Sequence, residues 1–93
     1  MKKRHAYIFF LKPRYDQIKQ TVPQHAEYWK SSNVEDFLGG TIADDSIGLI
    51  SFSANGLVEV SEIVLNDPLN RQNLIENRLI KEWIVDDSAL SES

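Results

Sequence analysis

The chain has 93 residues, 42% of them hydrophobic, and carries a formal net charge of −4 at pH 7. This length and composition predict a single globular domain with a modest core over residues 1–86, followed by an acidic tail over residues 87–93 that we expect to be frayed. The acidic balance argues against nucleic acid as a partner, because phosphate binding requires a basic face.

The first two elements are a strand and a helix. Residues 5–12 are rich in aromatic and β-branched side chains and almost continuously apolar, which is typical of a central strand, and the basic residues before them are expected to form a solvated leader. Residues 13–33 have apolar side chains at spacings of three and four, which predicts an amphipathic helix. Pro23 interrupts this pattern and is expected to kink the helix or to begin a second one capped by Thr21.

The remaining elements give the order β-α-β-β-α-β. We expect strands at residues 34–42, 46–53 and 74–85, a helix at residues 57–66, and a loop or short turn at residues 68–73. The helix is predicted despite its β-branched content, because its apolar residues fall on a single helical stripe. The order is the ferredoxin-like α+β pattern, in which two helices cover one face of a four-stranded sheet. A second copy of the chain is the simplest cover for the other face.

His25, inside the first helical segment, is the histidine best suited to chemistry, since histidine changes its charge near neutral pH. Asp67, in the Asn-Asp-Pro turn that ends the second helix, is its expected partner, and together they would form an acid–base dyad. Two structural alternatives remain open. His25 would lie on a polar helix edge or bind a backbone carbonyl, and Asp67 would begin a turn and cap local amides.

Three further residues are assigned to substrate binding. Tyr28 lies three residues after His25 on the same side of the helix, and its hydroxyl is expected to line a pocket. Asp45 is a second candidate for the carboxylate that meets His25, and Ser46, which directly follows that turn, is a candidate hydrogen-bond donor. Trp29 is assigned to the core, because it belongs to the apolar stripe of the helix.

No cofactor is expected from the sequence. Two histidines at distant positions and no cysteine do not make a metal-ligand cluster, and no glycine-rich phosphate loop is present. The absence of cysteine also excludes disulfides and thiolate chemistry and fits a cytoplasmic protein. No segment is long and apolar enough to span a membrane.

Several of these motifs, in this order, resemble the YciI-like (YCII-related) family. The resemblance covers residues 7–85 and rests on the His25 helix, the Gly39-Gly40 pair, the acidic turn after it, and the run Asn-Asp-Pro-Leu that begins at Asn66. It implies a dimeric α/β barrel, similar to muconolactone isomerase, in which two ferredoxin-like protomers pack sheet against sheet. It also implies a His–Asp active-site dyad, matched here by His25 and Asp67, and one relative is a dehydrochlorinase of a chlorinated hydroquinone.

The chain departs from the family pattern at two positions. Val22 stands where the family has an arginine, and Thr41 stands where it has a proline, and these departures weaken the case for an anionic substrate. The resulting hypothesis is a homodimeric, cofactor-free lyase or isomerase acting on a small organic compound. The alternative is a non-catalytic module that binds a small ligand or serves in dimerisation.

Overall fold

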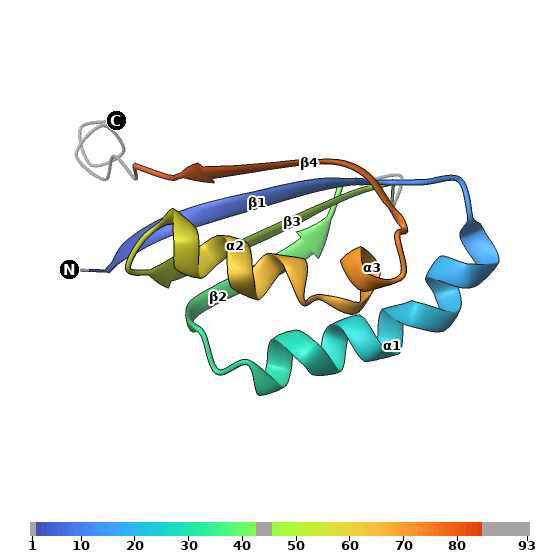
Figure 1. Ribbon diagram of the computed structural model, residues 1–93, viewed down its shortest axis with the longest axis horizontal. Coiled ribbons are helices and arrows are strands. Elements are labelled where there is room, and N and C mark those ends of the chain that lie inside the picture. The colour runs from blue at the N-terminus through green and yellow to red at the C-terminus, as the bar shows by residue number, and fades with distance from the viewer. Residues whose placement is uncertain (1, 43–45, 85–93) are drawn as a thin grey trace, which may run out of the picture.

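In the computed structural model, which describes residues 2–42 and 46–84, four strands form one antiparallel sheet in the order β2-β3-β1-β4. The elements in chain order are β1 (Lys3–Leu11), α1 (Tyr15–Ser31), β2 (Glu35–Thr41), β3 (Ile47–Ala54), α2 (Leu57–Leu65), α3 (Pro68–Arg71) and β4 (Ile75–Glu82). The helices all lie on one side of the sheet (Figure 1). The predicted ferredoxin-like α+β fold is therefore confirmed.

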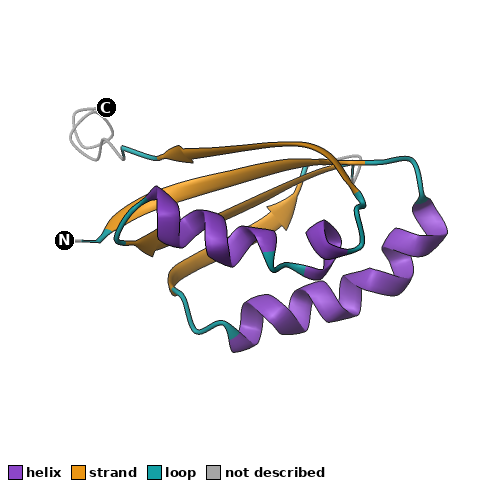
Figure 2. Cartoon of the chain, viewed as in Figure 1, coloured by secondary structure: helices purple, strands orange, loops and turns teal. Residues whose placement is uncertain are grey.

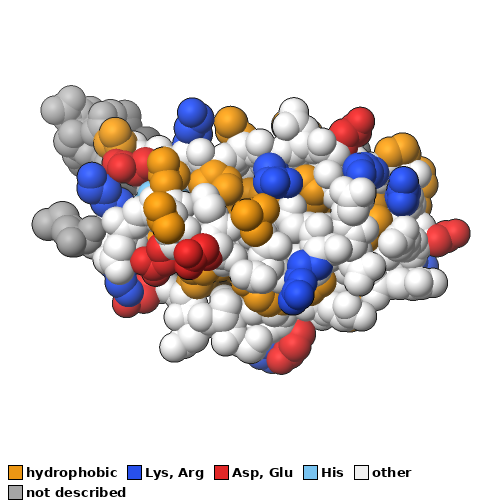
Figure 3. Space-filling model, viewed as in Figure 1, with side chains coloured by type: hydrophobic (Ala, Val, Ile, Leu, Met, Phe, Trp, Pro, Cys, Tyr) orange, Lys and Arg blue, Asp and Glu red, His pale blue; other side chains and the backbone are white. Residues whose placement is uncertain are grey.

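Asp45 and the expected frayed tail at residues 87–93 lie outside the described residues. Within the described part of the chain, no helix is long and apolar enough to cross a membrane. On the face shown in Figure 3, basic and acidic side chains are interspersed among hydrophobic ones.

The predicted leader is wrong, because β1 begins at Lys3. Lys3 pairs with Ala54 of β3, and Arg4 pairs with Ser53. The guanidinium of Arg4 donates hydrogen bonds to the hydroxyl of Ser51 at 2.8 Å and to a carbonyl of β2 at 3.1 Å. Lys3 and Arg4 thus belong to the sheet through their backbone pairing, while the Lys3 side chain stays exposed.

The first helix does not divide at Pro23. α1 continues through this proline, and the Thr21 hydroxyl donates to the carbonyl of Gln17 at 2.9 Å inside the helix instead of capping a new one. The predicted loop or short turn at residues 68–73 contains a single helical turn, α3, with Pro68 at its start and the Asp67 side chain as its cap.

The core lies between the sheet and the helices. Along β1, the side chains of His5, Tyr7 and Phe9 are buried against the helices, as the period of two in a strand requires. Val60 and Val64, four residues apart, are the buried positions of α2, which explains why a β-branched segment forms a helix here. Tertiary packing of this apolar stripe outweighs the weak helix propensity of valine.

The opposite face of the sheet has no helix over it within residues 2–42 and 46–84 (Figure 2). Leu79 of β4, Ile8 of β1 and Leu49 of β3 pair directly in register, so they form an apolar row across the sheet. Leu79 keeps 50% of its surface exposed, and Leu38 of β2 keeps 63%. We call this side the open face and the other side the covered face.

Candidate functional site

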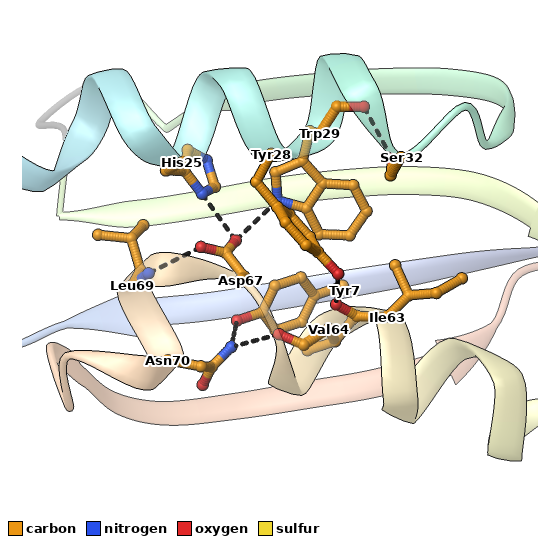
Figure 4. A network of polar contacts seen from close by, with 10 residues as sticks. All are labelled: Tyr7, His25, Tyr28, Trp29, Ser32, Ile63, Val64, Asp67, Leu69 and Asn70. Atoms are coloured by element: carbon orange, nitrogen blue, oxygen red, sulfur yellow. Dashed lines mark hydrogen bonds and ion pairs between the residues drawn. The ribbon is translucent and has the colours of Figure 1, made fainter.

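α1 and the turn before α3 bring the two predicted dyad residues together. The Nδ1 atom of His25 lies 2.7 Å from Oδ2 of Asp67, although the residues are 42 positions apart (Figure 4). Asp67 is fully buried, whereas the His25 side chain keeps 18% of its surface exposed. The carboxylate is therefore held inside the protein, and the imidazole lies between it and a solvent-accessible space.

A third side chain completes this contact. The indole Nε1 of Trp29 donates to the same Oδ2 of Asp67 at 2.7 Å. His25 and Trp29 are four residues apart on α1, so they project from the same face of the helix. The other carboxylate oxygen, Oδ1, accepts from the backbone N–H of Leu69 at 2.8 Å and caps α3. Asp67 thus has both of the roles that the sequence left open: it meets His25 and it caps local amides.

The partners of Asp67 determine which ring nitrogen of His25 carries a proton. The indole N–H of Trp29 and the backbone N–H of Leu69 can act only as donors, which suits an ionised carboxylate that accepts every bond. We infer that His25 donates through Nδ1, so Nε2 of the neutral imidazole is a hydrogen-bond acceptor. Nε2 makes no hydrogen bond to residues 2–42 or 46–84 and is available to a bound molecule.

His25 lines a cavity of about 560 Å³ between α1, the sheet and α3. One wall is a face of α1, with residues at spacings of one, three and four: Val22, His25, Ala26, Trp29, Lys30 and, just beyond the helix, Asn33. The facing wall is mainly apolar: Phe9, Leu11, Val34, Phe37, Gly39, Gly40, Thr41, Ile50 and Leu69. The cavity is therefore large enough for a small organic molecule and offers few polar groups.

Aromatic rings form much of this cavity. The ring of Phe9 packs edge-on to the imidazole of His25 at a centroid distance of 6.0 Å, and Trp29 stacks on Phe37 at 5.8 Å. Phe9 lies directly over Gly48 of β3, where a Cβ atom would fall inside the Phe9 ring. The bare glycine lets this ring lie against the sheet and so determines the depth of the cavity.

Of the predicted substrate-binding residues, Tyr28 and Ser46 lie outside the cavity that His25 lines. Tyr28 does not line the cavity; its hydroxyl donates to the carbonyl of Ile63 at 2.5 Å and ties α1 to α2. Burial raises the pKa of Tyr28. Ser46 is exposed beside the β2–β3 hairpin, and its carbonyl accepts from the backbone N–H of Leu11 at 2.9 Å. The structure brings His25 and Asp67 together but places Tyr28 and Ser46 outside the cavity.

A second polar network fixes α3 over the sheet. The side-chain amide of Asn70 donates to the hydroxyl of Tyr7 at 2.8 Å and to the carbonyl of Val64 at 2.9 Å. Burial raises the pKa of Tyr7 well above its ordinary value. Every buried side-chain nitrogen or oxygen in the described part of the chain has a hydrogen-bond partner. Asp67 is therefore positioned from both sides, by α1 and by a firmly anchored α3.

Sequence reasoning missed the polar role of Trp29, which it assigned to the core. The indole ring is indeed buried, with 4% of its surface exposed, but its N–H donates to the carboxylate of Asp67. The spacing of four between His25 and Trp29 was the available signal, because two donors on one helix face can reach the same acceptor.

Among residues 2–42 and 46–84, no three His, Asp or Glu side chains gather as metal ligands would.

No protein-family model and no characterised protein matches this chain in sequence. A solved structure is similar: 5-chloro-2-hydroxyhydroquinone dehydrochlorinase (TftG) from Burkholderia phenoliruptrix AC1100, in complex with 2,5-dihydroxybenzoquinone. The two superpose with a TM-score of 0.77 at 18% sequence identity, over 91% of this chain and 97% of the other. This chain therefore has the same fold as that dehydrochlorinase over nearly its whole length.

Proposed function

We propose that this protein is a cytoplasmic, cofactor-free lyase or isomerase of the YciI-like type that moves a proton on a small organic molecule. His25 is the acid–base group, and Asp67 orients it and stabilises its charged form. The observation that carries the proposal is the contact of His25 Nδ1 with the buried Asp67 carboxylate at 2.7 Å, on the wall of a cavity that fits such a molecule.

In the proposed reaction, Nε2 of His25 removes a proton from a C–H or O–H group of the bound molecule. The imidazolium that forms is stabilised by Asp67, whose carboxylate is fixed by the N–H groups of Trp29 and Leu69 and cannot turn away. The electron pair left on the substrate then either accepts a proton at another atom, which is isomerisation, or expels a leaving group, which is elimination. General acid–base catalysis of this kind typically contributes about 10²–10⁴-fold in rate.

The structural neighbour supports this reaction class. A dehydrochlorinase removes a proton and chloride from its substrate, and 2,5-dihydroxybenzoquinone, bound in that structure, is a small planar ring. The cavity of this chain, lined by the rings of Phe9, Trp29 and Phe37, suits a planar ring of that size.

We further propose that the open face is covered by a second copy of the chain, sheet against sheet, as in a dimeric α/β barrel. The apolar row formed by Leu79, Ile8 and Leu49 supports this arrangement, because an exposed apolar face on a small domain favours association.

The proposal is tested by proton exchange. The ring C–H groups of 2,5-dihydroxybenzoquinone are followed by proton NMR in D₂O, together with chloride release from chlorinated hydroquinones. We expect the wild-type protein to accelerate one of these reactions and His25→Gln to slow it by about 10²–10⁴-fold. Lys19→Gln, an exposed change on α1 outside the cavity, is the control and is expected to match the wild type. A folded His25→Gln protein that reacts at the wild-type rate would contradict the proposal.

The second candidate, a non-catalytic ligand-binding or dimerisation module, is favoured by the capping of α3 by Asp67. Asp67 caps α3 under either hypothesis, so a substitution of Asp67 lowers stability in both cases. The free energy of unfolding of a His25 variant is therefore the measurement that distinguishes them. If His25 has only a structural role, its replacement by glutamine lowers the free energy of unfolding by about 1–3 kcal/mol. Together with binding of 2,5-dihydroxybenzoquinone but no turnover by the wild type, that result would establish the module.

A further inference from the structure

The cavity has a second polar position at a distance from His25. His25 and Lys30 both line it from α1, and five residues of helix separate their Cα atoms by about 7.5 Å along the axis. Between them lies Trp29, stacked on Phe37 of β2 at 5.8 Å. The cavity thus has a proton-transfer position, an apolar middle and a cationic position, in that order along one helix face.

The ammonium group of Lys30 has no ion-pair partner among the described residues. The ion pairs there are Lys2–Glu35, Lys3–Glu82 and His25–Asp67. Lys30 stands in the last turn of α1, where a cation complements the helix dipole, and this accounts for a lysine at that end of the helix. It does not account for a lysine on the cavity wall. In a protein of net charge −4, an anionic ligand requires a local cation to offset the repulsion.

Asn33 adds a neutral polar group at the same end. It follows α1 in the left-handed conformation, with φ of 58°, and lines the cavity three positions after Lys30. Asparagine commonly ends a helix in this conformation, and its side-chain amide supplies hydrogen-bond donors. A cation and an amide at one end of an aromatic-lined cavity make up the set of groups that binds a carboxylate.

We propose that Lys30, assisted by Asn33, determines specificity for a substrate that carries an anionic group, such as a ring carboxylate, opposite the proton that His25 moves. This inference rests on the proposed function for the role of His25. Lys30 here takes no part in proton transfer. The valine at position 22, where the family has an arginine, therefore does not exclude an anionic substrate. Lys30 supplies a cation about two turns further along the same helix.

The test compares two ligands with the same ring and hydroxyl pattern, one anionic and one neutral. Isothermal titration calorimetry measures the Kd of 2,5-dihydroxybenzoate and of the neutral 2,5-dihydroxybenzamide for the wild type, Lys30→Gln, Lys30→Arg and Lys19→Gln. Lys19→Gln removes the same charge from an exposed site on the same helix outside the cavity. We expect the wild type to bind the acid about 5-fold more tightly than the amide, the size of a partly exposed ion pair.

Lys30→Gln is expected to lower the affinity for the acid by about 5-fold and so to remove this preference, whereas Lys30→Arg and Lys19→Gln are expected to keep it. Equal affinities in the wild type, no binding of either compound, or a loss of preference in Lys19→Gln as large as in Lys30→Gln would overturn the inference. Its failure is separable from that of the proposed function. Equal affinities in a protein with His25-dependent turnover reject the role of Lys30 alone, whereas an acid preference without turnover rejects the catalysis alone.

Discussion

The two faces of the sheet use the same strands in opposite ways. Along β1, Tyr7 and Phe9 point to the covered face and are buried, whereas their neighbours Ile8 and Phe10 point to the open face, where Phe10 keeps 38% of its surface exposed. The covered face combines this apolar core with a polar network centred on Asp67. The open face keeps its polar contacts, such as Arg4 to Ser51, beside an apolar row that no helix of residues 2–42 and 46–84 covers.

The covered face has its polar contacts satisfied within one chain, whereas the apolar surface of the open face would be buried only by a second copy. Buried polar groups on the covered face are satisfied within the chain, so the His25–Asp67 contact requires no partner. The apolar surface of the open face, by contrast, contributes no hydrophobic free energy of burial until another surface covers it. Substitutions on the two faces should therefore affect different properties: the stability of the fold and site on one side, and association on the other.

The largest effect is expected from Asp67→Ala on the covered face. It leaves the N–H donors of His25, Trp29 and Leu69 without their acceptor. Removing one partner of a buried charged contact typically costs about 3–5 kcal/mol, which should appear as a lower free energy of unfolding in urea denaturation. Gln20→Ala, at an exposed position of α1, is the control and should change it by less than about 0.5 kcal/mol. An Asp67→Ala protein as stable as the wild type would show that the network adds nothing to the fold.

Gly48→Ala should have the next largest effect, and it tests whether the glycine determines the position of Phe9 and so the depth of the cavity. The new methyl group would displace the ring of Phe9 toward His25. We expect a loss of about 1–3 kcal/mol in the free energy of unfolding, together with weaker binding of 2,5-dihydroxybenzoquinone in calorimetry. Gly40→Ala is the matched control for stability, because a Cβ atom at Gly40 meets no atom within 4 Å. Equal stability of the two variants would mean that Phe9 does not depend on Gly48.

Leu79→Lys tests the open face and should have the smallest effect on the fold. Leu79 is half exposed in the single chain, so the free energy of unfolding of the monomer should change little. If a second copy covers this face, the charge weakens the dimer by at least about tenfold in Kd, as measured by sedimentation equilibrium. Val58→Lys on α2, where the wild-type valine is 76% exposed, is the control and should leave the Kd unchanged. A wild-type protein that stays monomeric at micromolar concentration would remove the proposed dimer.

The order of the main elements could be predicted from local pattern. The apolar runs of β1 and β3, the period of 3.6 in α1 and the turn at Asn66 are properties of neighbouring residues. His25 and Asp67 could be named as partners only with the resemblance of their motifs to a known family, because the local context of each residue also fits a structural role. The start of β1 and the helix α3 could not be read in the same way, since strand pairing and the Asp67 cap decide them.

The sequence by itself determined the period of each element, and so which residues of one helix share a face, because these depend on a few consecutive residues. It therefore placed His25, Trp29 and Lys30 on one helix, but not what they face. The tertiary structure decided that His25 and Trp29 meet one oxygen of Asp67 and that Tyr28 turns away to Ile63. The physical reason is that these contacts join segments about 35 to 42 residues apart, and such distant segments are brought together by burial of the shared core and not by any local preference.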